Sequence, residues 1–308
     1  MMDRILHATG DCDVLCAIEH VCDNTAANRV MKMHGSRSAR GRRNRGDTAD
    51  EQRSESMIER QAEISTKDGR MNTFICHPER CGPHPVILFF MDAPGIREEL
   101  RDMARRLATV GYYVLLPNLY YRSNVEELVP YIGEAHTATR QRAMALMATI
   151  NIPMVMDDTD ALIAFATKDP AASQGPMGCV GYCMSGRYAV NAAVRHADRV
   201  RAAASIYGVA LVTDQPDSPH LAMQRTDARL YFGCAETDQY APKETIDALQ
   251  SELQNKGGNA EVEIYPGTHH GFAFPQRPVY NKPAAERHWE RLFTLFGEAL
   301  ALNTRSPT

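Results

Sequence analysis

The sequence predicts an α/β protein in which a mostly parallel sheet is covered by helices on both faces. From residue 57 onward, strand-like apolar runs alternate with segments of helical period, the order of elements that builds such a sheet. The runs are almost continuously apolar, as expected of strands buried on both faces. The chain has 308 residues, 44% of them hydrophobic and 23% charged, which is an ordinary globular composition.

The predicted strands follow one another along this part of the chain. Two short strands flank a Lys67-Asp68-Gly69 turn within residues 57–79. The six apolar runs that follow are predicted to be buried strands at 85–91, 112–117, 177–182, 202–208, 229–234 and 261–267.

Helices are predicted between the strands. Apolar residues recur at helical spacing over 96–111, which ends on Gly111, and residues 157–169 offer Asp157 or Asp158 as an N-terminal cap. Residues 282–301 place an apolar stripe on one helix face, which we expect to pack into the core rather than to bind a ligand. The stripe consists of Trp289, Leu292, Phe293 and Phe296.

Residues 1–56 differ from the rest in composition and show little hydrophobic periodicity. We expect them to be a disordered N-terminal extension, or to precede a translation start at Met57. The basic run 37–45 is expected to be a solvated tail rather than a nucleic-acid-binding arm. Residues 57–308 are predicted to form one domain. The cysteines and histidines of the extension are too irregularly spaced for zinc: His7, Cys12, Cys16, His20 and Cys22.

Charge and composition exclude several classes of function. With 34 basic and 38 acidic residues, the net charge of −4 gives no general attraction to nucleic acid or to an anionic membrane. No apolar run approaches the ~20 residues of a membrane span, and the first residues do not resemble a secretory signal. The eight cysteines lack paired CxxC spacing, so reduced thiols and a cytoplasmic location are expected. No glycine-rich phosphate loop with a lysine and no HExxH motif is found, so neither cofactor nor metal is expected.

The most specific local signal is the segment 181–186, Gly-Tyr-Cys-Met-Ser-Gly. It follows a buried strand and opens a helical pattern, which is the context of a nucleophile elbow. The sharp turn needs small neighbours and presents Cys183 at a helix N-terminus, where a thiolate is favoured. Taken alone, the motif is also compatible with a buried structural cysteine.

Later segments supply the acid and the base that such a nucleophile needs. Asp238 lies in a loop after strand 229–234, with Glu236 as its rival, and each could instead serve a helix N-terminus. His269 and His270 follow strand 261–267, so either histidine can be the base. The chain order of nucleophile, acid and histidine is the order expected of an elbow enzyme.

Together these motifs resemble the dienelactone hydrolase family, the cysteine-dependent branch of the α/β-hydrolase fold, over essentially all of 57–308. The matching motifs are GYCMSG, DQYAP, YPGTHHGF, FFMDAPGI, PNLYYR and SIYGV. The resemblance implies that Cys183 is the nucleophile, His270 the base and Asp238 the orienting acid, with His269 a bystander. Ser185 departs from the family, which often has glycine there.

The resemblance also implies an oxyanion hole and an auxiliary acid. The backbone N–H groups of Met184 and Ala93 match the two donors to the oxyanion. Asp92 matches a glutamate that contacts the resting thiol in the best-known members, but its side chain is one methylene shorter. Asp92 is therefore expected either to reach Cys183 through a water or to cap the following turn.

Three residues are candidates for substrate contact. Arg142 is weakly matched to one of the arginines that hold the substrate carboxylate in the family, with an exposed helical arginine as the alternative. Arg122 matches a motif residue for which a structural role is the alternative, and Tyr207 lies in the SIYGV motif. A second family arginine is replaced by Phe274, so dienelactone itself is less well supported as substrate than the nucleophile is.

The resulting prediction is a cofactor-independent carboxylic ester hydrolase, of the carboxymethylenebutenolidase type, that acts on an ester or lactone through an acyl-thioester. A carboxylesterase or thioesterase for another metabolite is the alternative among enzymes. A non-catalytic small-molecule-binding protein or a thiol redox protein is the alternative from another class. We expect a small-molecule partner, no nucleic acid or membrane partner, and a monomer or weak homo-oligomer.

Overall fold

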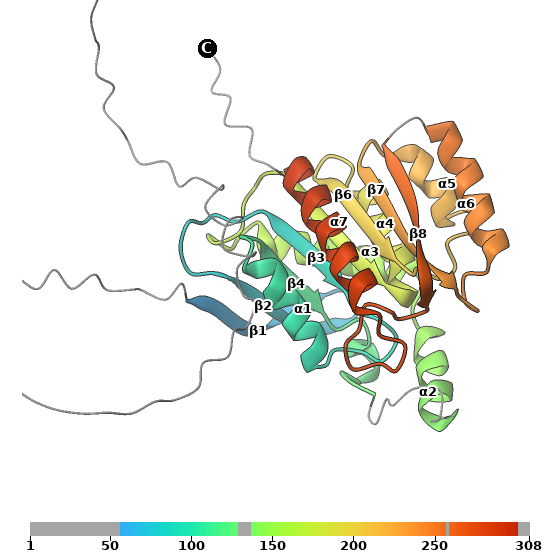
Figure 1. Ribbon diagram of the computed structural model, residues 1–308. Helices are drawn as coiled ribbons and strands as arrows, with labels where there is room; N and C mark the ends of the chain where they lie inside the picture. The colour runs from blue at the N-terminus through green and yellow to red at the C-terminus, as the bar shows by residue number, and fades with distance from the viewer. Residues whose placement is uncertain (1–55, 129–136, 257–258, 301–308) are drawn as a thin grey trace, which may run out of the picture. The chain divides into compact units, whose positions relative to one another are not determined.

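The computed structural model describes residues 56–128, 137–256 and 259–300. The strands are β1 (Met57–Thr66), β2 (Gly69–Pro78), β3 (Val86–Phe90), β4 (Tyr113–Pro117), β5 (Met177–Tyr182), β6 (Val200–Ile206), β7 (Arg229–Thr237) and β8 (Ala260–His269). They form one sheet in the order β1-β2-β4-β3-β5-β6-β7-β8 (Figure 1). Only β2 runs antiparallel to its neighbours, so the predicted, mostly parallel sheet is confirmed.

Helices cover both faces of this sheet (Figure 1). They are α1 (Glu98–Ala108), α2 (Thr137–Met147), α3 (Ile152–Ala166), α4 (Gly186–Arg195), α5 (Pro219–Ala222), α6 (Lys243–Lys256) and α7 (Lys282–Leu300). α1 and α7 are joined by a two-pronged ion pair between Arg106 and Glu286. α3 packs against α4, which contacts β5 and β6. No helix of the described residues is long and apolar enough to cross a membrane.

The N-terminal hairpin forms as predicted, with longer strands. β1 and β2 pair over ten residues each, and Thr66 pairs with Gly69 across the Lys67-Asp68 turn. Gly69 has a φ of 141°, a value that a residue with a side chain rarely adopts. The expectations for the extension 1–56 lie outside the described residues, apart from Ser56.

The predicted cap of the third helix is wrong. α3 begins at Ile152, and the side chain of Asn151 accepts a hydrogen bond from Met154 N at 2.9 Å. Asp157 and Asp158 lie inside the helix instead. Asp158 is 1% exposed and is bound by Arg122 and Tyr121, so a tertiary ion pair rather than capping explains its presence.

The candidate site lies at the carboxyl ends of strands that are buried in the core. Every residue of β3, β4 and β5 is buried. On α7, Trp289, Leu292 and Phe296 are buried and Phe293 is partly buried, as expected for a core stripe. The carboxyl ends of parallel strands meet at the same edge, which is where ligands bind in such sheets. The segments after β3, β5, β7 and β8 carry the predicted site residues.

Candidate active site

Cys183 lies at a strained turn between β5 and α4. Its φ is 55°, an uncommon value for a residue other than glycine, and the backbone strain is typical of a functional turn. The turn tolerates no larger neighbours: a Cβ on Gly181 would lie 2.0 Å from the Ser185 carbonyl oxygen, and one on Gly186 would lie 2.2 Å from Ser205 Oγ. The side chain of Cys183 is half-buried at the N-terminal end of α4. Backbone and surroundings therefore match the predicted elbow.

The loops after β7 and β8 bring His270 and Asp238 together. Nδ1 of His270 lies 2.7 Å from Oδ2 of Asp238. The other carboxylate oxygen of Asp238 accepts hydrogen bonds from Tyr240 N at 2.8 Å and Ala241 N at 3.3 Å, which fixes the carboxylate. The rival residues lie elsewhere: Glu236 accepts a hydrogen bond from the backbone of a residue in β8, and the neighbouring histidine, His269, is exposed.

The charges around His270 favour its protonated form. Burial by itself lowers the pKa of His270, but the charge of Cys183 and the hydrogen bond to Asp238 outweigh it and raise the pKa to about 10. In the described part of the chain, Nε2 of His270 is buried and makes no well-aligned hydrogen bond. The side chain of Cys183 lies close enough to interact with His270, since it contributes to the raised pKa.

The segments expected to supply the two oxyanion donors lie next to each other. The hydroxyl of Tyr120 is 3.1 Å from the carbonyl oxygen of Ala93 and 3.1 Å from Sδ of Met184. Ser185 Oγ donates a hydrogen bond to the carbonyl oxygen of Met91. The end of β3 is therefore tied to the elbow at two points.

Asp92 belongs to a buried ionic cluster. Its carboxylate is fully buried and is held by two guanidinium groups, with Arg97 Nη1 at 2.7 Å from Oδ1 and Arg277 bound to Oδ2. Arg97 also donates to Glu99 at 2.9 and 2.6 Å. Burial lowers the pKa of Arg97, but the carboxylates of Asp92 and Glu99 outweigh it and raise that pKa. Two arginines balance two acids, so the structure shows the Asp92 side chain in an ionic cluster and not as a cap of the following turn.

Both arginines of this cluster stack on the ring of Phe274. The ring is fully buried, with the guanidinium carbons of Arg97 and Arg277 at 4.9 and 4.6 Å from its centroid. Sequence reasoning missed Arg97, Glu99 and Arg277. For Arg277 a weak signal existed, since it lies only three residues after the position where the family arginine is absent.

The three candidates for substrate contact are not brought together. Arg122 is bound by Asp68 in the hairpin turn and by Asp158 in α3, so its guanidinium fastens two elements. Arg142 is exposed on α2.

Tyr207 and Tyr240 lie against the histidine. Tyr207 is 1% exposed, packs edge-on against His270 at 5.1 Å between ring centroids, and has a buried hydroxyl without a hydrogen-bond partner among the described residues. Tyr240 packs against the same ring at 4.9 Å. The guanidinium carbon of Arg140, on α2, lies 5.7 Å from the centroid of the Tyr240 ring. Arg140, which no sequence motif indicated, is therefore the arginine of α2 that approaches the candidate site.

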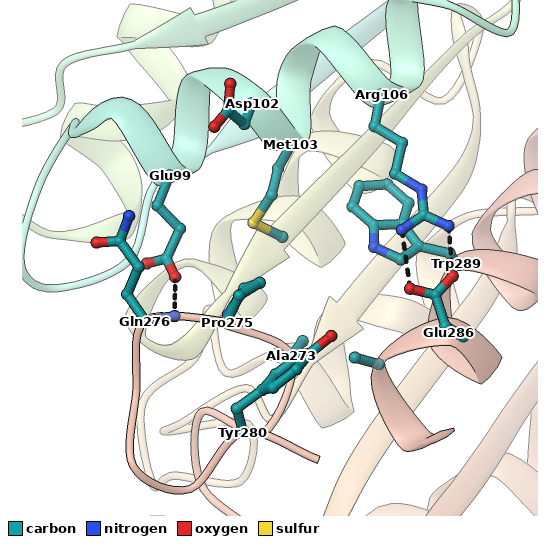
Figure 2. Close-up of a pocket in the computed structure, with 11 residues that line it drawn as sticks. Glu99, Asp102, Met103, Arg106, Ala273, Pro275, Gln276, Tyr280, Glu286 and Trp289 are labelled. Atoms are coloured by element: carbon teal, nitrogen blue, oxygen red, sulfur yellow. Dashed lines mark hydrogen bonds and ion pairs between the residues drawn. The ribbon is translucent and has the colours of Figure 1, made fainter. Parts of the chain in front are cut away.

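A separate cavity of about 220 Å³ lies between α1, α7 and the loop before α7 (Figure 2). Arg106 and Glu286 pair at one side, and Glu99 accepts a hydrogen bond from Gln276 N at 2.8 Å at the other. None of the predicted site residues lines it. Within the described residues, no group of three or more histidine, cysteine or acidic side chains could hold a metal ion.

Comparison with known proteins agrees with this geometry. The sequence profile described as the dienelactone hydrolase family matches residues 71–300. A putative carboxymethylenebutenolidase of Methylorubrum extorquens AM1 is 30% identical over 244 residues, covering 77% of this chain and 79% of that protein. A putative carboxymethylenebutenolidase of Escherichia coli K12 is 27% identical, covering 76% of this chain and 84% of that protein.

A solved structure supports the fold. The putative dienelactone hydrolase of Klebsiella pneumoniae superimposes with a TM-score of 0.69 at 21% identity, covering 79% of this chain and 99% of that one. Because the family profile spans most of the chain and a relative shares 30% identity over most of both lengths, the chain belongs to the dienelactone hydrolase family and is a carboxylic ester hydrolase with the α/β-hydrolase fold.

Proposed function

We propose that this enzyme hydrolyses an ester or lactone with Cys183 as the nucleophile, through an acyl-thioester intermediate. The observation that carries the proposal is the left-handed turn that presents Cys183 beside His270, whose Nδ1 is held 2.7 Å from Asp238. A thiol beside an imidazolium is a stronger nucleophile than a serine hydroxyl, because it is more readily ionised. Asp238 orients the imidazole.

The proposed reaction has two acyl-transfer steps. The Cys183 thiolate attacks the carbonyl carbon, and the oxyanion is stabilised by Met184 N–H and Ala93 N–H. The carbon–oxygen bond to the leaving group then breaks, and the proton of His270 Nε2 passes to the leaving alkoxide. In the second step His270 takes a proton from water, the hydroxide attacks the thioester, and the carbon–sulfur bond breaks to release the acid and restore the thiolate.

Features of the site bear on the substrate class. A cysteine nucleophile favours activated esters such as enol lactones, whose leaving group is weakly basic. The leaving group of a lactone stays attached to the acyl chain, so deacylation must outrun re-closure. The ring of Tyr207 packs against His270 and its hydroxyl has no partner among the described residues, and Arg277, which binds Asp92, lies near the position where Phe274 replaces the family arginine. A lactone carrying a carboxylate therefore belongs in the substrate panel.

The test is turnover of p-nitrophenyl acetate and of dienelactone by wild type, Cys183→Ala and a matched control, Cys81→Ser, which alters an exposed cysteine. We expect Cys183→Ala to abolish turnover and Cys81→Ser to retain it. Mass spectrometry of the quenched reaction should find the acyl group on the peptide that contains Cys183. Turnover that survives in Cys183→Ala would overturn the proposed nucleophile.

The alternatives are separated by the same panel. Hydrolysis of simple esters or thioesters without dienelactone turnover would indicate a carboxylesterase or thioesterase for another metabolite. No turnover of any member would favour the binding or thiol redox function. We also propose a cytoplasmic location and a monomer or weak homo-oligomer, to be checked by cell fractionation and by sedimentation.

A further inference from the structure

Two hydrogen-bonding side chains connect the end of β3 to the nucleophile elbow. Ser185 Oγ donates to the carbonyl oxygen of Met91, and both residues are buried. Tyr120 OH lies 3.1 Å from the carbonyl oxygen of Ala93 and 3.1 Å from Met184 Sδ. The two expected oxyanion donors belong to Ala93 and Met184, so one link contacts both of these residues and the other joins residues within two positions of them.

Tyr120 is itself held firmly. It is fully buried, and its backbone N–H donates to Asn118 Oδ1 at 2.9 Å. Asn118 in turn donates to Asn72 Oδ1 and to the Val125 carbonyl oxygen, both at 2.9 Å. Burial raises the pKa of Tyr120, and the nearby charges of Cys183 and Asp92 raise it further, so the phenol remains a proton donor over the working pH range.

We propose that Tyr120 and Ser185 are positioning residues that together set the distance between the two oxyanion donors. Ser185 replaces the glycine often found at this position of the family, so this chain has a side-chain link that a glycine cannot make. The inference rests on the proposed function. Oxyanion donors work only at hydrogen-bond distance from the developing charge, and a displacement of about 1 Å can cost on the order of 100-fold in rate.

The test uses Tyr120→Phe, Ser185→Gly and the double variant, with Tyr121→Phe as the matched control. Tyr121 adjoins Tyr120 and is also buried, but its hydroxyl bonds to Thr66 and Asp158. We expect each single variant to lower kcat for p-nitrophenyl acetate by about 10-fold with KM changed less than about 2-fold. The fall in kcat of the double variant should deviate from the product of the two single effects, because both side chains set the distance between the same two donors. Tyr121→Phe should keep the wild-type kcat.

A second readout separates positioning from loss of structure. Alkylation of Cys183 by iodoacetamide needs the thiolate but no oxyanion hole, so its rate should stay within about 2-fold of wild type in both single variants. An unchanged kcat in both variants would overturn the inference, as would a parallel fall in kcat and alkylation rate. If wild type shows no Cys183-dependent turnover, both the proposed function and the inference that rests on it are refuted. If wild type shows such turnover and the variants have the same kcat, only the inference is refuted.

Discussion

Replacing Asp92 by asparagine tests whether this carboxylate acts as an ionic support or as the base of the thiol. The substitution keeps the shape of the side chain and removes its charge, which leaves Arg97 and Arg277 facing an amide. The side chains of these arginines are only 10% and 12% exposed, so water cannot replace the lost carboxylate. Breaking a buried ion pair on one side typically costs about 3–5 kcal/mol.

The expected magnitude lies at the lower end of that range. Arg97 retains its two hydrogen bonds to Glu99 and one to the carbonyl oxygen of Gly95. We therefore expect the free energy of unfolding to fall by about 3 kcal/mol. For a domain of this size, 1 kcal/mol corresponds to roughly 2–4 °C in Tm, so a decrease of about 6–12 °C is expected.

The assay combines urea unfolding of Asp92→Asn with iodoacetamide alkylation of Cys183 in the folded variant at pH 7. Asp247→Asn is the control, because Asp247 forms an exposed pair with Lys243 on α6 and should change stability by less than about 1 kcal/mol. Alkylation of Asp92→Asn should be no slower than that of wild type. Wild-type stability together with a large fall in the alkylation rate would refute the reasoning and identify Asp92 as the base.

The remaining predictions concern residues away from the chemistry. Burial lowers the pKa of His288 to about 4 in the folded protein. Between about pH 6.5 and 4, His288 therefore takes up a proton in the unfolded protein but not in the folded one. The stability that this group contributes is present above about pH 6.5 and is lost as the pH falls through that window. His288→Gln should flatten this loss in urea unfolding, whereas substitution of the exposed His269 should not. Gly297→Ala on α7 meets no atom within 4 Å and should raise the free energy of unfolding by roughly 0.5–1 kcal/mol; a decrease would contradict the helix-propensity argument. Arg122→Ala should lower stability by about 3 kcal/mol, because it leaves a buried carboxylate unpaired, with KM unchanged; a raised KM for a carboxylate substrate would assign Arg122 to the site after all.

The sequence predicts the position in the fold of those candidate site residues that local chain geometry determines. A buried strand, a turn with small residues and a helix place Cys183 at the turn, because a strand-to-helix turn of this kind is sharp and exposes the residue at its tip. The acid and histidine loops were placed for a similar reason, since each follows the carboxyl end of a parallel strand. Local sequence could not decide between Asp238 and Glu236; that distinction rests on which carboxylate faces His270.

The ionic cluster could not be predicted in the same way. Asp92 and Arg277 are 185 positions apart, and no periodicity in either segment indicates that they meet. The error at α3 has the same origin. Asp157 and Asp158 have the chemistry of a cap, but Asn151 occupies that position, and the buried aspartate serves Arg122. Acidic residues suit several local roles, and tertiary packing selects among them.

The shorter acid at position 92 and the arginine three residues beyond Phe274 meet in one ionic cluster. The glutamate that the resemblance implies for the family at position 92 is one methylene longer than this aspartate. Aspartate leaves both carboxylate oxygens with Arg97 and Arg277, whose guanidinium groups also lie over the ring of Phe274. Cys183 and Asp238 are, by contrast, the two side chains that raise the pKa of His270. On the proposed mechanism His270 assists the ionisation of Cys183, and wild type should therefore react with iodoacetamide in the absence of any ligand, faster than His270→Ala by an order of magnitude or more.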